Sequence, residues 1–184
     1  MTAYRFYTAT SLDGFIATPD DDLGWLLSQP IDQDGPMSYA EFIAGIGAIV
    51  MGSSTYAWIL EHGTSGTEEG GDGWDYEQPA FVLSHRALEP AAASVRIVSG
   101  PVEALRGQLE EAAGDGDVWI VGGGDLAAQF ARAGMLDEII VSIAPVTLGA
   151  GKPLFTGAFD LDLVEHARNR AFLCARYRVL GPRQ

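Results

Sequence analysis

Three glycines late in the chain follow an apolar segment and could hold the phosphates of a ligand. Residues 119–121 read Trp-Ile-Val, Gly122 to Gly124 follow, and a predicted helix begins at Asp125 and Leu126. Glycine lets a backbone approach a ligand closely because it has no Cβ atom. The start of a helix adds free N–H donors and partial positive charge, which suit a pyrophosphate. A tight turn without a ligand explains the same glycines equally well, because a glycine run alone is weakly specific.

A second junction has the same form near residue 52. The apolar segment 48–51 leads to Gly52, and Ser53, Ser54 and Thr55 stand at the start of another predicted helix. Their hydroxyls could cap that helix or bind phosphate oxygens. Two such junctions in one parallel sheet can flank a single crevice at the carboxyl ends of the strands, as the two halves of a dinucleotide require. The G-x-G-x-x-G fingerprint after a first strand is absent, which argues against a classical Rossmann dehydrogenase.

Two more candidates also follow predicted strands. Arg86, two residues after Ser84, could bind a phosphate at two points, although a solvated surface arginine is the alternative. Asp13 precedes Gly14 after the first predicted strand. It could orient hydroxyl groups of a substrate or cofactor, or it could simply be a turn residue.

The segments that must position these residues alternate between strands and helices. This order predicts a mainly parallel central sheet with an antiparallel C-terminal edge, in one domain spanning residues 1–184. A Gly- and acid-rich loop without Lys or Arg covers residues 61–78, and its Trp74 and Tyr76 slightly favour a lid over disorder. The predicted strands are 4–11, 15–17, 48–51, 80–83, 95–98, 118–121, 138–145, 161–168 and 172–180, and the predicted helices are one capped by Ser38, 53–60, 102–113 and 125–133.

Composition narrows the class of protein. The formal net charge is −14, so long-range electrostatics disfavour nucleic acid and anionic membranes as partners. Cys174 is the single cysteine, which excludes an intrachain disulfide and a thiolate metal cluster, and no metal site is expected. No apolar run is long enough to span a bilayer and no signal peptide is recognised, so a cytoplasmic location is expected.

The motifs, in this order, resemble the dihydrofolate-reductase-like superfamily, and most closely the C-terminal reductase domain of RibD and its stand-alone relatives. The resemblance implies a three-layer α/β fold with helices on both faces of the sheet. It also implies an NADPH-dependent reductase of a small heterocyclic substrate, as in riboflavin biosynthesis, and a homodimer. The stretches that carry it are 11–17 (SLDGFIA), 50–56 (VMGSSTY), 82–84 (VLS), 120–124 (IVGGG) and 145–155 (PVTLGAGKPLF).

The same resemblance implies roles for individual residues. Gly122 to Gly124, with Asp125 and Leu126, would hold the pyrophosphate and the ribose beside nicotinamide, and Gly52 to Thr55 would hold the phosphates from the other side. Ser84 and Arg86 would lie near the adenosine 2′-phosphate. Asp13 would lie near nicotinamide and substrate, as an orienting or proton-relay group. Leu148 and Lys152, in the segment 148–155, would shape the substrate side.

Two alternatives remain within the same fold. Dihydrofolate reductases usually have an arginine after the glycine that matches Gly52, where this chain has Ser53, and a carboxylate on the first helix, for which Asp34 and Glu41 are poor candidates. A true dihydrofolate reductase is therefore one alternative, which antifolate inhibition would reveal. The other is a nucleotide-binding module without catalytic activity. Trp25 and Trp74 could cover the site, or could simply pack in the core.

Overall fold

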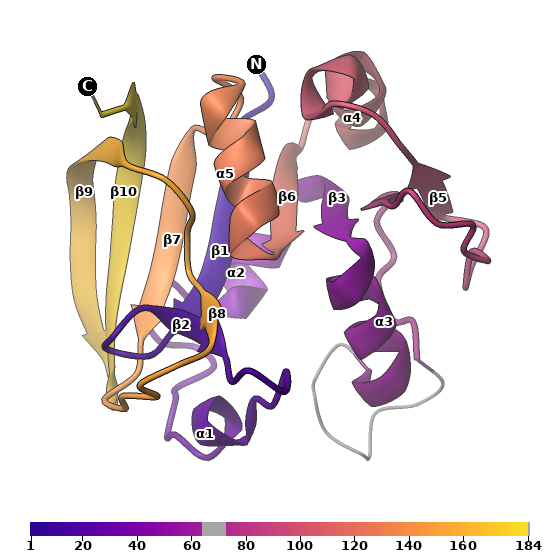
Figure 1. Ribbon diagram of the computed structural model, residues 1–184. Coiled ribbons are helices and arrows are strands. Elements are labelled where there is room, and N and C mark those ends of the chain that lie inside the picture. Colours follow the sequence, from indigo (N-terminus) through magenta and orange to yellow (C-terminus); the bar gives the residue numbers. More distant parts are fainter. Residues whose placement is uncertain (64–72, 184) are drawn as a thin grey trace.

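The computed structural model describes residues 1–63 and 73–183 (Figure 1). Ten strands and six helical segments lie in these two ranges. In chain order they are β1 (Tyr4–Thr10), β2 (Phe15–Ala17), α1 (Gly24–Leu27), α2 (Tyr39–Ile43), β3 (Ile46–Gly52), α3 (Ser53–His62), β4 (Ala80–Leu83), β5 (Val95–Val98), the 3₁₀ helix η1 (Val102–Leu105), α4 (Arg106–Ala113), β6 (Asp117–Gly122), α5 (Gly124–Arg132), β7 (Glu138–Ile143), β8 (Lys152–Pro153), β9 (Phe159–Asn169) and β10 (Phe172–Pro182).

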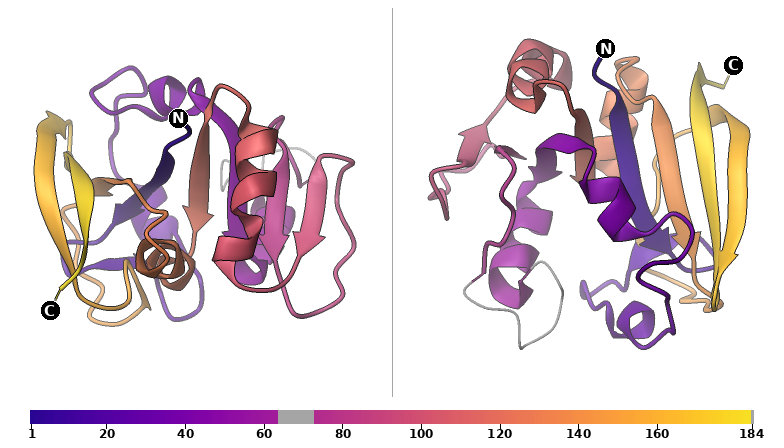
Figure 2. Two further views of the ribbon diagram at one scale, coloured as in Figure 1. Left: turned by 90° about the horizontal axis from the view of Figure 1, so that it is seen from above. Right: turned by 180° about the vertical axis from the view of Figure 1, so that it is seen from behind.

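Eight of the strands form one mixed sheet in the order β5-β4-β3-β6-β1-β7-β10-β9. The six strands from β5 to β7 are parallel, and β10 and β9 add antiparallel strands at one edge, as the sequence predicts. Helices cover both faces of the sheet (Figure 2). The three-layer α/β fold is therefore confirmed.

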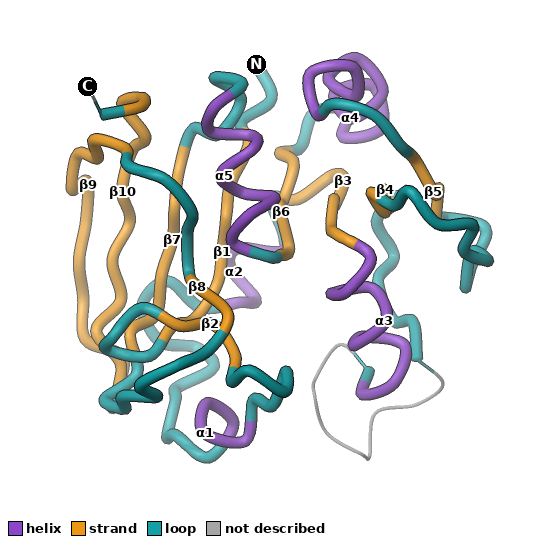
Figure 3. The backbone as a smooth tube through the Cα atoms, viewed as in Figure 1, coloured by secondary structure: helices purple, strands orange, loops and turns teal. Residues whose placement is uncertain are grey.

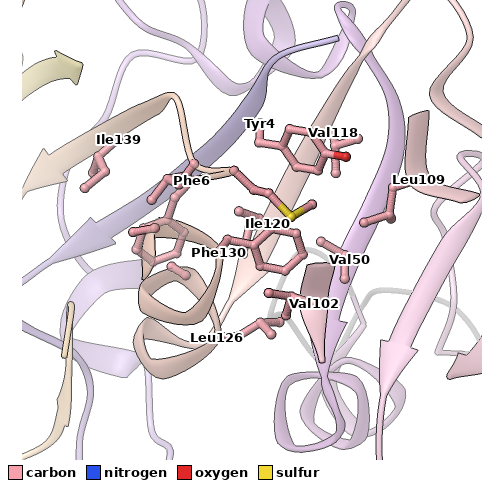
Figure 4. Close-up of a cluster of buried hydrophobic side chains, with 14 of the residues drawn as sticks. Tyr4, Phe6, Val50, Val102, Leu109, Val118, Ile120, Leu126, Phe130 and Ile139 are labelled. Atoms are coloured by element: carbon pink, nitrogen blue, oxygen red, sulfur yellow. The ribbon is translucent and has the colours of Figure 1, made fainter. Parts of the chain in front are cut away.

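The alternation of side chains along the parallel strands divides the core between the two faces of the sheet. One face buries Val50, Val118 and Ile120 against the helices α4 and α5, through residues such as Leu109 and Phe130 (Figure 4). The other face buries residues one step along the same strands, such as Ile49 and Trp119, against α2 and α3. Because successive side chains of a strand point to opposite faces, the apolar strands 48–51 and 118–121 supply both cores.

The shorter elements agree with the predictions in part. Ser38 caps α2 by accepting a hydrogen bond from the N–H of Glu41 at 3.3 Å. The predicted helix 102–113 begins instead as the 3₁₀ turn η1 and continues as α4. The two-residue strand β8, which pairs with β2, has no counterpart among the predicted strands. Within the described part of the chain, no helix is long and apolar enough to cross a bilayer.

The aromatic residues considered as covers of the site are partly buried and pack against core clusters instead. Trp74 packs edge-on against Tyr56, and Tyr76 packs against Trp119. Trp25 packs in a separate small cluster beside Phe172. Packing is thus the role that the structure gives these residues, and the rest of the predicted lid, residues 64–72, lies outside the described residues.

Candidate functional site

A cavity of about 610 Å³ lies at the carboxyl ends of the parallel strands and extends from β5 to β1. Its volume falls within the range of roughly 300–1,000 Å³ that is typical of small-molecule and cofactor sites. The connection between β2 and α2, which contains α1, runs below the end of β1 and supplies Leu23 and Leu26 to the lining (Figure 3). The predicted site residues on the lining are Gly52, Ser53, Ser54, Thr55, Ser84, Gly122, Gly123, Gly124, Asp125, Leu126 and Lys152.

The two glycine-marked junctions are neighbours at the middle of this cavity. Strands β3 and β6 run parallel, and Met51 pairs with Gly122, so α3 and α5 both begin beside the same stretch of the lining. The residue preceding each helix is a glycine, and within the described residues no side chain caps either N-terminus. The hydroxyls of Ser53, Ser54 and Thr55 therefore do not cap α3. The first N–H groups of a helix have no partner within the helix, so both helix starts offer donors to the cavity.

At the late junction, Gly123 and Gly124 each have a different structural reason to be glycine. A Cβ atom placed on Gly123 would meet no atom within 4 Å, so this residue faces open space. A Cβ atom on Gly124 would lie 2.3 Å from the carbonyl oxygen of Pro153 and 2.4 Å from that of Leu154. Gly124 therefore lets the β8 segment pack against the start of α5, whereas Gly123 leaves room for a ligand. The peptide bond between Gly122 and Gly123 is cis.

At the β4 end of the cavity, Arg86 links the turn after β4 to the start of α3. Its guanidinium Nη2 donates a hydrogen bond to the hydroxyl of Ser53 at 3.3 Å. Its own backbone N–H donates to the hydroxyl of Ser84 at 2.9 Å, which fixes the turn after β4. Arg86 is exposed and is not itself part of the lining, but its side chain contacts Ser53, which is a lining residue. The structure thus brings Ser53, Ser84 and Arg86 together at one end of the cavity.

The β1 end of the cavity is mostly apolar. Ile16, Leu23 and Leu26 line it. Its two charged residues, Lys152 and Asp21, form an ion pair with 3.6 Å between Nζ and Oδ2. Their side chains are about half exposed, which makes the pair worth at most about 1 kcal/mol.

Asp125 stands at the start of α5, where its carboxylate has partners within the protein. Oδ2 accepts a hydrogen bond from the Gln129 side chain at 2.9 Å, and Oδ1 accepts one from the Thr156 hydroxyl at 3.1 Å. A negative charge at a helix N-terminus is favourable for the helix, but it competes with an anionic ligand for the same field. Asp125 therefore attaches α5 to the segment after β8, and it does so whether or not a ligand is bound.

Asp13 and Leu148 lie outside the cavity lining and contact each other. The Asp13 carboxylate accepts hydrogen bonds from the backbone N–H of Leu148 at 3.0 and 3.1 Å and of Gly149 at 2.7 Å. The Ser11 hydroxyl donates a further bond at 2.5 Å. The Ser11 bond, followed by the two backbone bonds, lowers the pKa of Asp13 to about 2. These bonds make the Asp13 carboxylate a clasp between the turn after β1 and the loop after β7, and its proton-relay role stays a prediction.

Several lining residues escaped the sequence reasoning. Trp58 reaches the cavity from the second turn of α3, and Ser99 and Gly100 follow β5. The rule that strand ends meet at one edge could have found Ser99 and Gly100, because they stand after β5 as Ser84 stands after β4. Trp58 carries no such signal, because an apolar position on a helix usually packs in the core.

The fold and this cavity together define a class of α/β protein. A mainly parallel sheet, an antiparallel C-terminal edge and a cavity at two uncapped helix starts are those of a dihydrofolate-reductase-like fold. The chain belongs to the RibD C-terminal domain family, which matches residues 5–172. This membership confirms the resemblance carried by the sequence motifs.

Individual relatives support the same family. YwjB of Bacillus subtilis is 29% identical over 150 residues, which cover 81% of this chain and 80% of YwjB. A candidate riboflavin biosynthesis protein from Shewanella sp. PV-4 has a similar structure, with a TM-score of 0.80, 25% identity, and coverage of 97% of this chain and 99% of the other. RibD of Acinetobacter baumannii shares the fold, with a TM-score of 0.69 and 20% identity, and this chain covers 58% of its length.

Proposed function

We propose that this chain is an NADPH-dependent reductase that transfers a hydride to a small heterocyclic substrate. Family membership supports a reductase of the kind found in riboflavin biosynthesis. One neighbour of the same fold, from Thermotoga maritima, is a deaminase and 5-amino-6-(5-phosphoribosylamino)uracil reductase, of which this chain covers 56%. The cavity supplies the independent structural support.

The observation that carries the proposal is the pair of uncapped helix starts at adjacent strand ends. Free N–H groups of α3 and α5 border one stretch of the cavity, and Gly123 leaves open space where another residue would place a Cβ atom. This arrangement fits a pyrophosphate group, because backbone donors and helix dipoles bind anions without lysine or arginine. The residues proposed to hold it are Gly52, Ser53, Ser54, Thr55, Gly122, Gly123 and Leu126.

Preference for NADPH over NADH is proposed to come from the β4 end. Ser53, Ser84 and Arg86 form the cluster there, and Arg86 is the residue with a planar guanidinium suited to a phosphate. A 2′-phosphate would gain a charge-assisted hydrogen bond from Arg86, which a plain 2′-hydroxyl would not. The adenosine half is therefore assigned to the β4 side, and the reacting half to the β1 side.

The residues at the β1 end are proposed to align the reactants and exclude water. NADPH supplies the hydride from its nicotinamide ring when bound, so the protein has to hold the acceptor against that ring. Ile16, Leu23 and Leu26 form an apolar wall for this purpose. Asp13 acts at a distance, by holding the loop that contains Leu148, and it is assigned a positioning role.

A titration with NADPH followed by turnover tests the proposal. Purified protein is expected to bind NADPH with one site per chain, and to oxidise it when a family substrate such as 5-amino-6-(5-phosphoribosylamino)uracil or its unphosphorylated form is added. Binding without oxidation in the presence of any heterocyclic acceptor would favour the nucleotide-binding module instead. Failure to bind NADPH or NADH would remove the proposal altogether.

A further inference from the structure

We infer that the hydride acceptor of this protein is an uncharged heterocycle that carries no phosphate group. The inference rests on the proposed function, because it concerns the β1 end of the same cavity. It follows from the placement of every cationic side chain in the protein, and from the pairing of the single lysine.

All cationic side chains can be placed, although residues 64–72 and 184 are not described. Those ten residues read TSGTEEGGD and Gln, so they contain no Lys, Arg or His. The eleven Lys and Arg residues of the chain all lie in the described ranges. Any cationic side chain that could bind a phosphate on the substrate is therefore one whose position is known.

Lys152 is the one cation on the β1 half of the cavity lining within the described residues. His85 lines the opposite, β4 end, and Arg86 lies beside it with its guanidinium on Ser53. The remaining arginines lie outside the lining, and most of them have partners of their own. Those with an ion pair are Arg5, Arg106, Arg132, Arg176, Arg178 and Arg183.

The charge of Lys152 is balanced before any substrate binds. Its ammonium lies 3.6 Å from the carboxylate of Asp21, and both residues line the cavity. Asp20 and Asp22 flank Asp21 in the sequence, so the segment that supplies the partner of Lys152 carries three carboxylates. A phosphate dianion would have to displace Asp21 from Lys152 and would then lie near the displaced carboxylate, which is electrostatically unfavourable.

The ion pair between Lys152 and Asp21 also disfavours a substrate with a positively charged ring. Among the residues that the structure describes, the carboxylates on the lining are Asp21, which is paired with Lys152, and Asp125, which is bonded to Gln129 and Thr156. Neither is free to form a bidentate pair with a protonated ring. The adjacent walls are the apolar side chains Ile16, Leu23 and Leu26. An uncharged ring matches a lining with balanced charges and apolar walls.

Calorimetric titration of the NADP⁺-loaded protein tests the inference with a matched pair of compounds, because the oxidised cofactor fills its site but has no hydride to transfer. The probes are 5-amino-6-(5-phosphoribosylamino)uracil and the same compound without its phosphate. The unphosphorylated compound is expected to bind at least about tenfold more tightly. Equal affinity, tighter binding of the phosphorylated compound, or failure of both to bind at millimolar concentration would each overturn the inference. Loading with NADP⁺ is measured first, so a failure of the proposed function appears as absent cofactor binding in that step.

The variant Asp21→Asn tests the cause of the discrimination. It frees Lys152 and removes one negative charge, so the affinity for the phosphorylated compound is expected to rise several-fold while that for the other compound stays the same. Asp20→Asn is the matched control, because it removes the same charge from a neighbouring exposed residue outside the lining. An equal gain in both variants would show that net charge alone is responsible, and no gain in Asp21→Asn would contradict the assigned role of the ion pair.

Discussion

The guanidinium of Arg86 donates a hydrogen bond to the hydroxyl of Ser53, at 3.3 Å, across 33 positions of the chain. This contact joins the turn after β4 to the first residue of α3. It places the one arginine at this end of the cavity beside an uncapped helix start, so two sources of positive potential act on the same point. The pair therefore defines the end of the cavity to which the proposed 2′-phosphate is assigned.

Replacing Arg86 tests that assignment. Arg86→Ala is expected to weaken NADPH binding by roughly 1.5–3 kcal/mol, the range for a hydrogen bond to a charged group. NADH affinity should change little, because it has no 2′-phosphate. Fluorescence titrations with both cofactors measure the difference. Arg106→Ala is the control, since it removes an equal charge from α4, outside the cavity lining. Equal losses for NADPH and NADH in Arg86→Ala would contradict the assignment.

The adjacent glycines Gly123 and Gly124 should respond in opposite ways to the same substitution. Gly123→Ala is expected to leave the thermal midpoint nearly unchanged, because its Cβ meets open space, and to weaken NADPH binding by more than about tenfold. Gly124→Ala is expected to destabilise the protein by about 1–3 kcal/mol, because its Cβ overlaps the carbonyl oxygens of residues 153 and 154. Thermal unfolding and cofactor titration on both variants separate the two effects. Normal cofactor affinity in Gly123→Ala would show that the ligand does not approach there.

Trp58 should report on occupancy of the cavity. Trp58 lines the cavity as well as packing against a core cluster, whereas Trp25, Trp74 and Trp119 pack in core clusters and are not among the lining residues. Binding of NADP⁺, which does not absorb tryptophan emission, is expected to quench the protein fluorescence, and Trp58→Phe should remove most of that quench. Trp25→Phe serves as the comparison and should keep it. A quench that survives in Trp58→Phe would indicate a ligand bound elsewhere.

The clasp formed by Asp13 predicts a specific dependence of stability on pH. Hydrogen bonds from Ser11, Gly149 and Leu148 lower the pKa of the carboxyl from 3.8 to about 2. A carboxyl whose pKa is lower in the folded than in the unfolded state raises the free energy of unfolding. The full contribution is present at pH values above the unfolded-state pKa, and it is lost as the pH falls towards the folded-state pKa. Wild type should therefore be more stable than Asp13→Asn above about pH 4, and the gap should narrow between pH 4 and pH 2.

Thermal midpoints of both proteins from pH 7 to pH 2 measure that gap. NADPH oxidation at pH 7 provides a second readout. A loop clasp predicts that Asp13→Asn changes KM for the acceptor more than kcat. A large loss of kcat at an unchanged thermal midpoint would instead restore Asp13 as a proton relay.

The sequence predicts the fold well because its strands have unambiguous patterns. The apolar strands at 48–51 and 118–121 are buried on both faces, and the glycines after them mark where helices begin. The predicted phosphate-binding residues lie together because parallel strands end at one edge. Local pattern could not place Asp13 and Leu148, which lie outside the cavity lining, because their positions depend on how the loop after β7 folds back. That path is set by contacts 135 and 136 positions apart, which local pattern cannot show.

The central position of β1 has a consequence for how the protein is made. Its neighbours in the sheet are β6 and β7, so Tyr4 pairs with Val118 and Arg5 pairs with Glu138. During synthesis on the ribosome, β1 stays unpaired on both sides until more than a hundred further residues have emerged. The cavity lining extends to Pro153, so a ligand can assist folding only after that residue has emerged. Long-range pairing of this kind slows folding. The nascent chain should therefore depend most on chaperones before β1 has paired with β6 and β7.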